Sequence, residues 1–230
     1  QGRRLCLAAM AAGVALAVRQ SWQAGPAEAL AHWTTGPARP GRWTLADGSV
    51  LHANANTALA LRTEGVAPHL ALLRGEIAWL GAARGAVVET PHLRVHTDAP
   101  CALLVRADAQ GGCAAARDGA ARVAPAGRHG ATQPLPPGAT LHPWDWQGVD
   151  PWAFTEGVLS VRQTPLAVFA AELARHHARA IGCDPALAAL RVSGTFQLGD
   201  LDGALALLAR LLPLQVRHGW GGVRLAALEG

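Results

Sequence analysis

The side chains that could carry out chemistry are few in this sequence, and their spacing does not suit an active site. His176 and His177 are adjacent rather than four residues apart, so on a helix their rings diverge and do not converge on one metal ion. Asp145, Asp150 and Glu156 could supply a carboxylate pair for acid–base catalysis, but they lie in a Trp- and Pro-containing stretch without supporting polar residues. We therefore expect no enzyme, no metal site and no cofactor, with a periplasmic enzyme of carbohydrate or envelope metabolism as the weaker alternative.

Recognised catalytic motifs and a nucleic-acid-binding pattern are both missing. The sequence has no GxSxG, HExxH, CxxC or P-loop motif, and it contains no Lys for a Schiff base. The net charge of +4 comes from dispersed arginines, whereas a nucleic-acid-binding domain clusters its basic residues on one stripe with aromatic residues between them. We expect no nucleic-acid partner.

The segment Leu5–Val18 is a run of fourteen uncharged, apolar residues. As a helix it would be ~21 Å long, shorter than the ~30 Å hydrocarbon core, but Arg3 and Arg4 can extend to one interface and Trp22 to the other. We expect residues 1–22 to form a single-pass inner-membrane anchor, with the rest of the chain in the periplasm of a Gram-negative cell. A secretory signal peptide and a buried core helix are the alternatives.

Residues 42–141 have the pattern of an all-β domain built from hairpins, preceded by a linker over 23–41. Asp47-Gly48 lies between two apolar runs, Arg42–Leu45 and Val50–Ala53, which is a strong hairpin signal because Gly adopts a positive φ without strain. Further short strands are predicted at Thr57–Arg62, His69–Leu73, Glu76–Leu80, Ala86–Thr90, His92–Thr97, Ala102–Arg106 and Arg122–Ala124. Loops are predicted over Ala107–Gly119 and Gly127–Gly138.

Residues 153–230 contain one small pattern twice, a strand followed by a helix. Its members are Gly157–Val161 with Thr164–Arg175, then Arg191–Leu198 with Leu201–Leu212, and a closing strand pair at Leu214–Arg217 and Gly222–Leu228. This predicts an α+β domain of two βαβ units, in which a sheet covers both helices.

Each predicted helix has an apolar face and a start signal. Thr164 is the expected N-cap of the first helix with Pro165 at its first position, and Asp200 or Asp202 begins the second. The faces consist of Leu166, Phe169, Ala170, Leu173 and His177 in the first helix, and of Leu201, Leu205, Leu208, Leu211 and Leu212 in the second. Pro213 should end the second helix.

Two smaller features allow alternatives. The stretch 142–152 holds two Trp in three residues, which indicates either a seam between the two domains or an aromatic ligand platform. Cys101 and Cys113 could form a disulfide in an oxidising periplasm or remain small buried thiols.

Several segments, in this order and spacing, resemble the FecR family of inner-membrane regulators that pair with extracytoplasmic-function sigma factors. They are Trp43–Ser49, Asn56–Ala58, Leu72–Glu76, Val88–Pro91, Leu93–Val95, Thr164–Leu166 and Ala188–Phe196. The closing duplicated pattern resembles the module named "secretin and TonB N-terminus".

The resemblance implies a role in cell-surface signalling. Such regulators relay ligand occupancy of an outer-membrane TonB-dependent receptor, commonly for iron or siderophore uptake, to a sigma factor. The receptor's periplasmic signalling domain docks on the C-terminal part, and periplasmic and intramembrane proteases then cleave the regulator. The sigma-binding cytoplasmic domain would precede the membrane segment and is not part of this sequence.

The docking surface expected within the C-terminal domain is the outer face of its first helix together with the edge of the following strand. The residues of this predicted partner-binding surface are Glu172, Arg175, Arg179, Arg191, Ser193 and Thr195. The alternative function is a secretin-type structural assembly module of the envelope, which would associate with copies of itself.

Overall fold

The computed structural model describes residues 30–37, 39–62, 67–109, 111–126, 131–141, 147–177 and 179–228. The expected membrane anchor, Cys6, and the Trp pair with Asp145 lie outside these ranges. The chain divides into two compact units. The first contains most residues up to Pro143, and the second runs from Trp144 onward together with the short segments Thr35–Gly41 and Asn54–Asn56.

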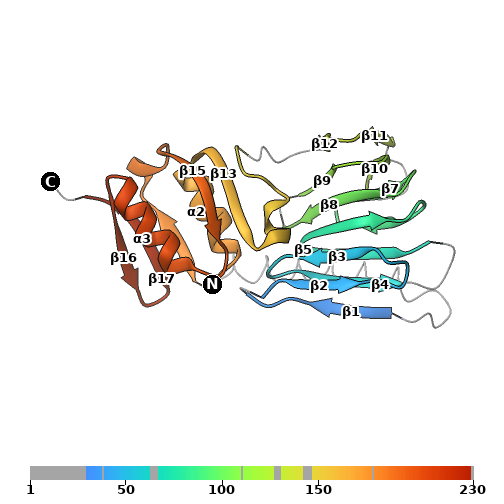
Figure 1. The fold of residues 1–230 in the computed structure, drawn as a ribbon, viewed down its shortest axis with the longest axis horizontal. Helices are drawn as coiled ribbons and strands as arrows, with labels where there is room; N and C mark the ends of the chain where they lie inside the picture. The colour runs from blue at the N-terminus through green and yellow to red at the C-terminus, as the bar shows by residue number, and fades with distance from the viewer. Residues whose placement is uncertain are drawn as a thin grey trace, which may run out of the picture. The chain divides into compact units, whose positions relative to one another are not determined.

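The first unit is built from β-strands (Figure 1). Its strands are β1 (Leu30–Thr34), β2 (Gly41–Thr44), β3 (Val50–Ala53), β4 (Ala58–Arg62), β5 (His69–Ala82), β6 (Val87–Glu89), β7 (Leu93–Thr97), β8 (Cys101–Ala107), β9 (Gly112–Ala116), β10 (Ala121–Pro125), β11 (Gln133–Leu135) and β12 (Thr140–Leu141).

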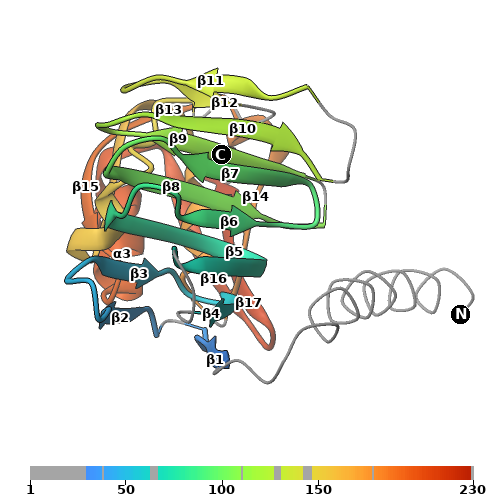
Figure 2. The ribbon, with the colours of Figure 1, turned by 90° about the vertical axis from the view of Figure 1, so that its right-hand side faces the viewer.

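Strand β5 organises this unit because its two halves pair with different neighbours. The first half pairs with β4 and β6, and the second half pairs with β3 and β8. From there the strands continue as β6–β7–β10–β11 on one side and β8–β9–β12 on the other; Figure 2 shows β11, β10, β7, β6 and β5 in this order. Gly75, with a φ of 98°, lies between the two halves.

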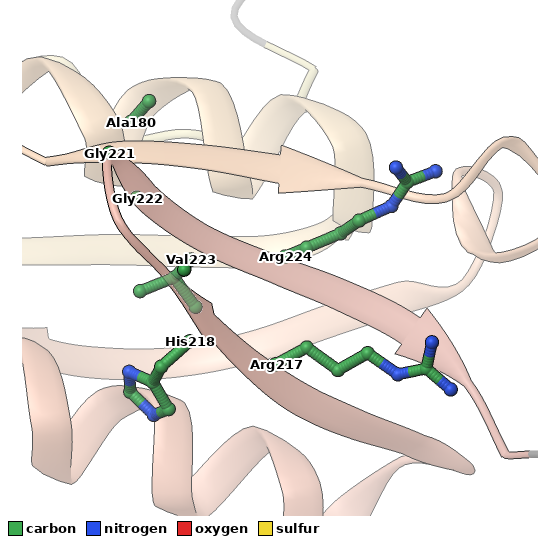
Figure 3. Close-up of a pocket in the computed structure, with 8 residues that line it drawn as sticks. Ala180, Arg217, His218, Gly221, Gly222, Val223 and Arg224 are labelled. Atoms are coloured by element: carbon green, nitrogen blue, oxygen red, sulfur yellow. The ribbon is translucent and has the colours of Figure 1, made fainter.

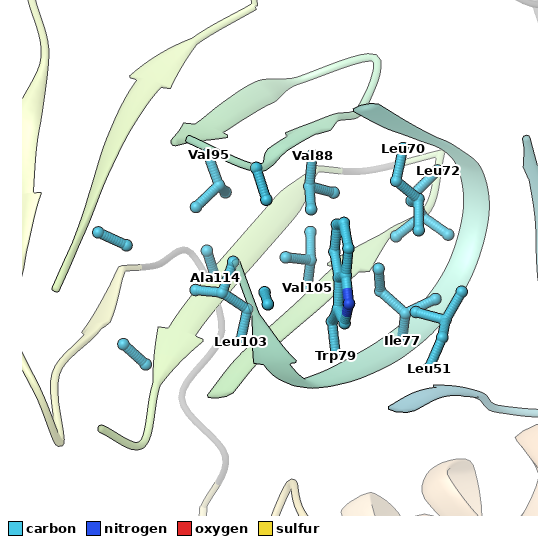
Figure 4. Packing of buried hydrophobic residues seen from close by; sticks show 14 of the residues in the cluster. Leu51, Leu70, Leu72, Ile77, Trp79, Val88, Val95, Leu103, Val105 and Ala114 are labelled. Atoms are coloured by element: carbon cyan, nitrogen blue, oxygen red, sulfur yellow. The ribbon is translucent and has the colours of Figure 1, made fainter. Parts of the chain in front are cut away.

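The core of the first unit fills the space that the curved β5 encloses (Figure 4). Trp79 is its largest fully buried side chain, and leucines and valines from β3 to β11 surround it. The Trp79 indole nitrogen donates a hydrogen bond of 2.9 Å to the Ser49 hydroxyl, and Ser49 donates one of 2.6 Å to Asp47. The predicted Asp47-Gly48 hairpin is therefore confirmed and also supplies the polar partner that a buried indole needs.

The mainly β prediction is confirmed, but several boundaries differ. The runs predicted as His69–Leu73 and Glu76–Leu80 form one strand, since Gly75 bends the chain without interrupting it. Part of the segment expected to be a linker is strand β1, and the two predicted loops contain strands β9 and β11. Strand β9 consists of small residues and glycine, whose β propensity is low, so its sequence resembles a loop.

The disulfide alternative for Cys101 and Cys113 is wrong. Cys101 is a free, buried thiol, and the register of β8 and β9 pairs Cys113 with Arg106. Arg106 is five positions along β8 from Cys101, roughly 17 Å in an extended strand. Burial raises the pKa of Cys101 to about 11, which keeps this thiol protonated.

The second unit alternates strands with helices (Figure 1). Its elements are η1 (Ala153–Glu156), β13 (Val158–Pro165), α2 (Leu166–Arg175), β14 (Ala180–Cys183), η2 (Pro185–Leu187), β15 (Arg191–Gln197), α3 (Leu201–Leu211), β16 (Leu214–Gly219) and β17 (Gly222–Ala227). The order β13–α2–β14 is repeated as β15–α3–β16, so the duplicated strand–helix–strand pattern is confirmed.

The strands of each repeat belong to two small sheets rather than one. β13 and β15 form an antiparallel pair, and β17 lies between β14 and β16 in a three-stranded sheet. Phe169 of α2 contacts Phe196 of β15 edge to face, with ring centroids 4.7 Å apart. Apolar residues of both helices are buried: Leu166, Phe169, Ala170 and Leu173 in α2, and Leu201, Ala204, Leu205 and Leu208 in α3.

Four details predicted for this unit require correction. Thr164 is not an N-cap, because it belongs to strand β13, where it is fully buried and pairs with Val192 of β15. Pro165 takes the capping position. His177 follows the end of α2 instead of lying on its face. Leu211 is 68% exposed, so the buried face of α3 is narrower than predicted and uses Ala204 in its place. Strand β14 was not predicted, since it is only four residues long and includes a glycine.

Within the described ranges, none of the helices has the length and the apolar character that a membrane crossing requires.

Candidate partner-binding site

The predicted docking residues on α2 are engaged with each other. Arg175 donates a hydrogen bond of 2.7 Å to the Glu172 carboxylate, one helical turn earlier, and both side chains are partly buried. An ion pair three residues apart supports a helix modestly. Glu172 and Arg175 therefore contribute to the end of α2 whether or not they contact a partner.

The predicted residues on β15 lie beside a bulge in β13. The β13–β15 register shifts between Val161 and Thr164, and Gln163 within this shift has a φ of 52°. The Gln163 backbone N–H donates a 2.8 Å hydrogen bond to the Ser193 hydroxyl, and Arg191 donates one of 3.0 Å to the Gln163 carbonyl. Two of the three predicted strand residues thus fix the conformation of the bulge.

The remaining predicted residues lie in different places. Thr195 is exposed and faces Ser160 across the strand pair. Arg179 lies beyond the end of α2, and its guanidinium is 3.4 Å from the Nδ1 of His218 on β16. Arg179 therefore contacts the β16–β17 hairpin, a region that the sequence analysis did not single out.

The outward face of the β16–β17 hairpin is a shallow hollow with two arginines. The register pairs Arg217 with Arg224 and Gly219 with Gly222, so these four residues share one face of the sheet. The hollow has a volume of about 330 Å³ and is lined by Ala180, Arg217, His218, Gly219, Gly221, Gly222, Val223 and Arg224. In Figure 3 the two arginine side chains extend in the same direction, away from His218.

Glycines create this hollow. No side chain projects from the sheet at positions 219 and 222, which leaves the backbone of both hairpin strands accessible beside Ala180 of β14. Any other residue at position 222 would force the backbone to shift, since its Cβ would collide with the Ala180 carbonyl of the adjacent strand. The close approach of β14 and β17 therefore depends on glycine at this position.

The electrostatic character of the hollow is basic. Arg224 contacts Asp184 through two guanidinium nitrogens, at 2.6 Å each. The hydrogen bond from Arg224 lowers the pKa of Asp184 from its ordinary value, so the carboxylate stays charged. Arg217 is exposed, and its positive charge also lowers the pKa of Asp184.

Trp220 forms the tip of the hairpin and is fully exposed. Two of its neighbours, Gly219 and Gly221, offer no side chain that could cover it. Sequence analysis missed this residue, although one signal was available: a lone Trp within Gly219–Gly222, between two predicted strands, can only lie in a tight turn.

The described part of the chain offers no clustered metal ligands. Its His, Cys, Asp and Glu side chains form no group of three that could hold a metal ion. Asp150 accepts a hydrogen bond of 2.9 Å from the Trp152 backbone and so shapes a turn. Burial lowers the pKa of His177 and raises that of Cys183.

The hollow offers cationic and backbone contacts to an anionic partner.

No family model and no curated protein matches this chain. Two crystal structures of a proposed anti-sigma factor from Parabacteroides distasonis have a similar fold. The first, at 2.50 Å resolution, has a TM-score of 0.66 and 20% identity, and the match covers 87% of this chain and 100% of that chain. The second, at 1.65 Å, has a TM-score of 0.65 and 19% identity, with 86% and 100% covered. At this level of identity the comparison shows a similar fold and nothing further.

Proposed function

We propose that this chain is the periplasmic sensor part of a FecR-like anti-sigma regulator. The observation that carries the proposal is the fold: a β unit followed by a duplicated strand–helix–strand unit, similar over 87% of the chain to a proposed anti-sigma factor. The FecR-like segments of the sequence support the same function. The chain would present a surface to another macromolecule and catalyse no reaction.

The partner in this proposal is the periplasmic signalling domain of an outer-membrane TonB-dependent receptor. Docking would report ligand occupancy, here of an iron or siderophore receptor, and proteolysis in the periplasm and membrane would then release a sigma factor bound to a preceding cytoplasmic domain. The test is binding of the full chain to the purified signalling domain of the TonB-dependent receptor encoded beside its gene, measured by isothermal titration calorimetry. Saturable binding is expected, and its absence would contradict the proposal.

Membrane attachment through Leu5–Val18 is a separate part of the proposal. The full chain, expressed in a Gram-negative host, should fractionate with the inner membrane and resist extraction with sodium carbonate. Deletion of residues 5–18 should release it. If the undeleted chain is extracted as readily as the deleted one, the segment is not an anchor.

A secretin-type assembly module is the alternative, because the duplicated strand–helix–strand unit also resembles that class. A module of this kind binds copies of itself, whereas the proposed sensor binds a different chain. Sedimentation velocity of the 5–18 deletion variant across a concentration series separates the two. Concentration-dependent ring-sized species would favour the assembly module.

A further inference from the structure

We propose that the β16–β17 hairpin, with Trp220 at its tip and Arg217 and Arg224 on its outward face, docks onto a strand edge of a partner protein that carries acidic side chains. This inference rests on the proposed function in one respect: it names the surface through which the sensor meets its partner. The surface differs from the one predicted from sequence on α2 and β15.

The free edge of β16 supplies the first argument. Within the described strands β16 pairs with β17 alone, so every second residue of β16 directs its N–H and C=O groups away from the sheet. An edge of this kind is a template for another strand. A lipid surface cannot satisfy a row of backbone donors and acceptors, which favours a protein as the occupant.

Charge decides what kind of protein fits. The outward face of the hairpin carries the exposed side chains of Arg217 and Arg224, and Asp184 pairs with Arg224. His218, on the edge strand, contacts Arg179. An acidic strand would place carboxylates beside Arg217 and Arg224, where the hollow leaves room for its side chains. Complementary charge of this kind accelerates association and excludes basic partners.

A second copy of this chain fits poorly at the same edge. Antiparallel pairing of two β16 strands over residues 215–219, with both outward faces on the same side, would place Arg217 directly opposite the second Arg217. Like charges this close on neighbouring strands are destabilising. The partner is therefore a different protein.

Trp220 supplies the apolar contact. An indole that is fully exposed at the tip of a hairpin, flanked by glycines, can enter a recess on a partner without rearrangement of the sheet. Tryptophan and arginine are the residues most enriched among those that dominate binding energy at protein interfaces. The hairpin thus combines an exposed apolar side chain, a basic face and a free strand edge.

The test measures affinity of full-chain variants for the purified receptor signalling domain, at 50 and 300 mM NaCl. Trp220→Ala should weaken binding by about tenfold or more. Arg217→Glu should weaken it several-fold and reduce its salt dependence. Leu211→Ala, an exposed leucine on α3, and Arg162→Glu, an exposed arginine on β13, are matched controls and should stay within about twofold of the unchanged chain. Thr195→Glu tests the surface predicted from sequence.

The outcomes separate this inference from the proposed function. If the unchanged chain binds, and Thr195→Glu abolishes binding whereas the hairpin variants do not, the hairpin is not the docking surface. The proposed function would still stand. No binding by the unchanged chain would overturn both. A Trp220-dependent association with anionic phosphatidylglycerol vesicles, with receptor-domain affinity unaffected by the hairpin variants, would identify a lipid surface as the occupant and overturn the inference. Circular dichroism melts verify that each variant is folded.

Discussion

At the scale of single residues, the contacts of Trp79 show how a surface turn supports the core. The indole is fully buried, and its nitrogen donates to the Ser49 hydroxyl, which itself donates to the Asp47 carboxylate. Ser49 lies in the hairpin turn that the sequence predicts from Asp47-Gly48. The turn residues therefore do two things, since they reverse the chain and orient an acceptor toward the largest core side chain.

We predict that Ser49→Ala destabilises the first unit by about 1–3 kcal/mol, because it leaves a buried indole N–H without its acceptor. Thr44→Ala, on the exposed side of the same hairpin, is the control and should change stability by less than about 0.5 kcal/mol. Urea unfolding followed by tryptophan fluorescence measures both. Equal losses for the two variants would mean that the Ser49–Trp79 hydrogen bond contributes nothing.

At the scale of elements, the bend in β5 depends on one glycine. Gly75 has a φ of 98°, and a Cβ there would collide with both the backbone and the side chain of Thr57. The Thr57 hydroxyl exchanges hydrogen bonds with the backbone N–H and C=O of Glu76, so the collision would occur at a point that is already fixed. The two halves of β5 can pair with different neighbours because this close contact is available to glycine alone.

Gly75→Ala should therefore destabilise the first unit considerably more than Gly81→Ala. Both glycines have positive φ, but a Cβ at Gly81 meets no atom within 4 Å. Gly81→Ala should cost about 1 kcal/mol from backbone strain, and Gly75→Ala at least about 2 kcal/mol more from the collision. Urea midpoints of the two variants provide the comparison, and similar midpoints would contradict the steric argument.

The helix α3 allows a matched test of its buried face. Leu205 is buried and Leu211 is 68% exposed, although a helical pattern places both on one apolar face. Leu205→Ala should destabilise the second unit by about 2–5 kcal/mol, and Leu211→Ala by less than about 0.5 kcal/mol. Thermal unfolding monitored by circular dichroism at 222 nm reports both. A large effect of Leu211→Ala would indicate that this leucine is covered in solution.

The elements that the sequence predicts well are those with a strong periodic pattern. Helices α2 and α3 and the hairpin at Asp47-Gly48 were found because apolar spacing, proline and Asp-Gly are local signals. Strand β9 was missed, since the residues Gly-Cys-Ala-Ala-Ala have a low local preference for a strand. Their extended conformation depends on pairing with the neighbouring strands. Whether Leu211 is buried or exposed likewise depends on where the helix contacts the rest of the unit.

The candidate site was harder to predict than the fold for a related reason. Exposed charges on a helix face suggested α2 and β15, but the structure shows that Glu172 and Arg175 pair with each other and that Arg191 and Ser193 hold a bulge. The basic hollow needs three strands in register, and two of them, β14 and β17, are parallel neighbours separated by about forty residues of sequence. Local patterns carry no information about that pairing.

At the scale of the whole molecule, histidines in both units link stability to pH. Burial is the largest cause that lowers the pKa of His52 and His96 in the first unit and of His177 in the second. For His96 the positive charges of Arg94 and Arg122 add to this effect. Each of these histidines therefore binds a proton more readily in the unfolded chain than in the folded one.

The sign of the effect follows from this difference. A group whose pKa is lower in the folded state contributes its full stability above the unfolded pKa, about 6.5 for His, and that contribution is lost as the pH falls below this value. We predict that the urea midpoint of the full chain decreases steadily from pH 7.5 to pH 5.5. Asp184, the carboxylate whose pKa is lowered, titrates below this window and so does not contribute to the change.

His96→Gln tests the assignment. Glutamine cannot take up a proton, so this variant should lose less stability than the unchanged chain between pH 7.5 and pH 5.5, whatever its stability at pH 7.5. The matched control is Thr44→Gln, at an exposed position of the same unit that carries no titratable group, and it should leave the pH dependence as it is. A urea midpoint that rises on acidification, or a His96→Gln variant with the slope of the unchanged chain, would show that proton uptake by the partly buried histidines does not govern stability in this range.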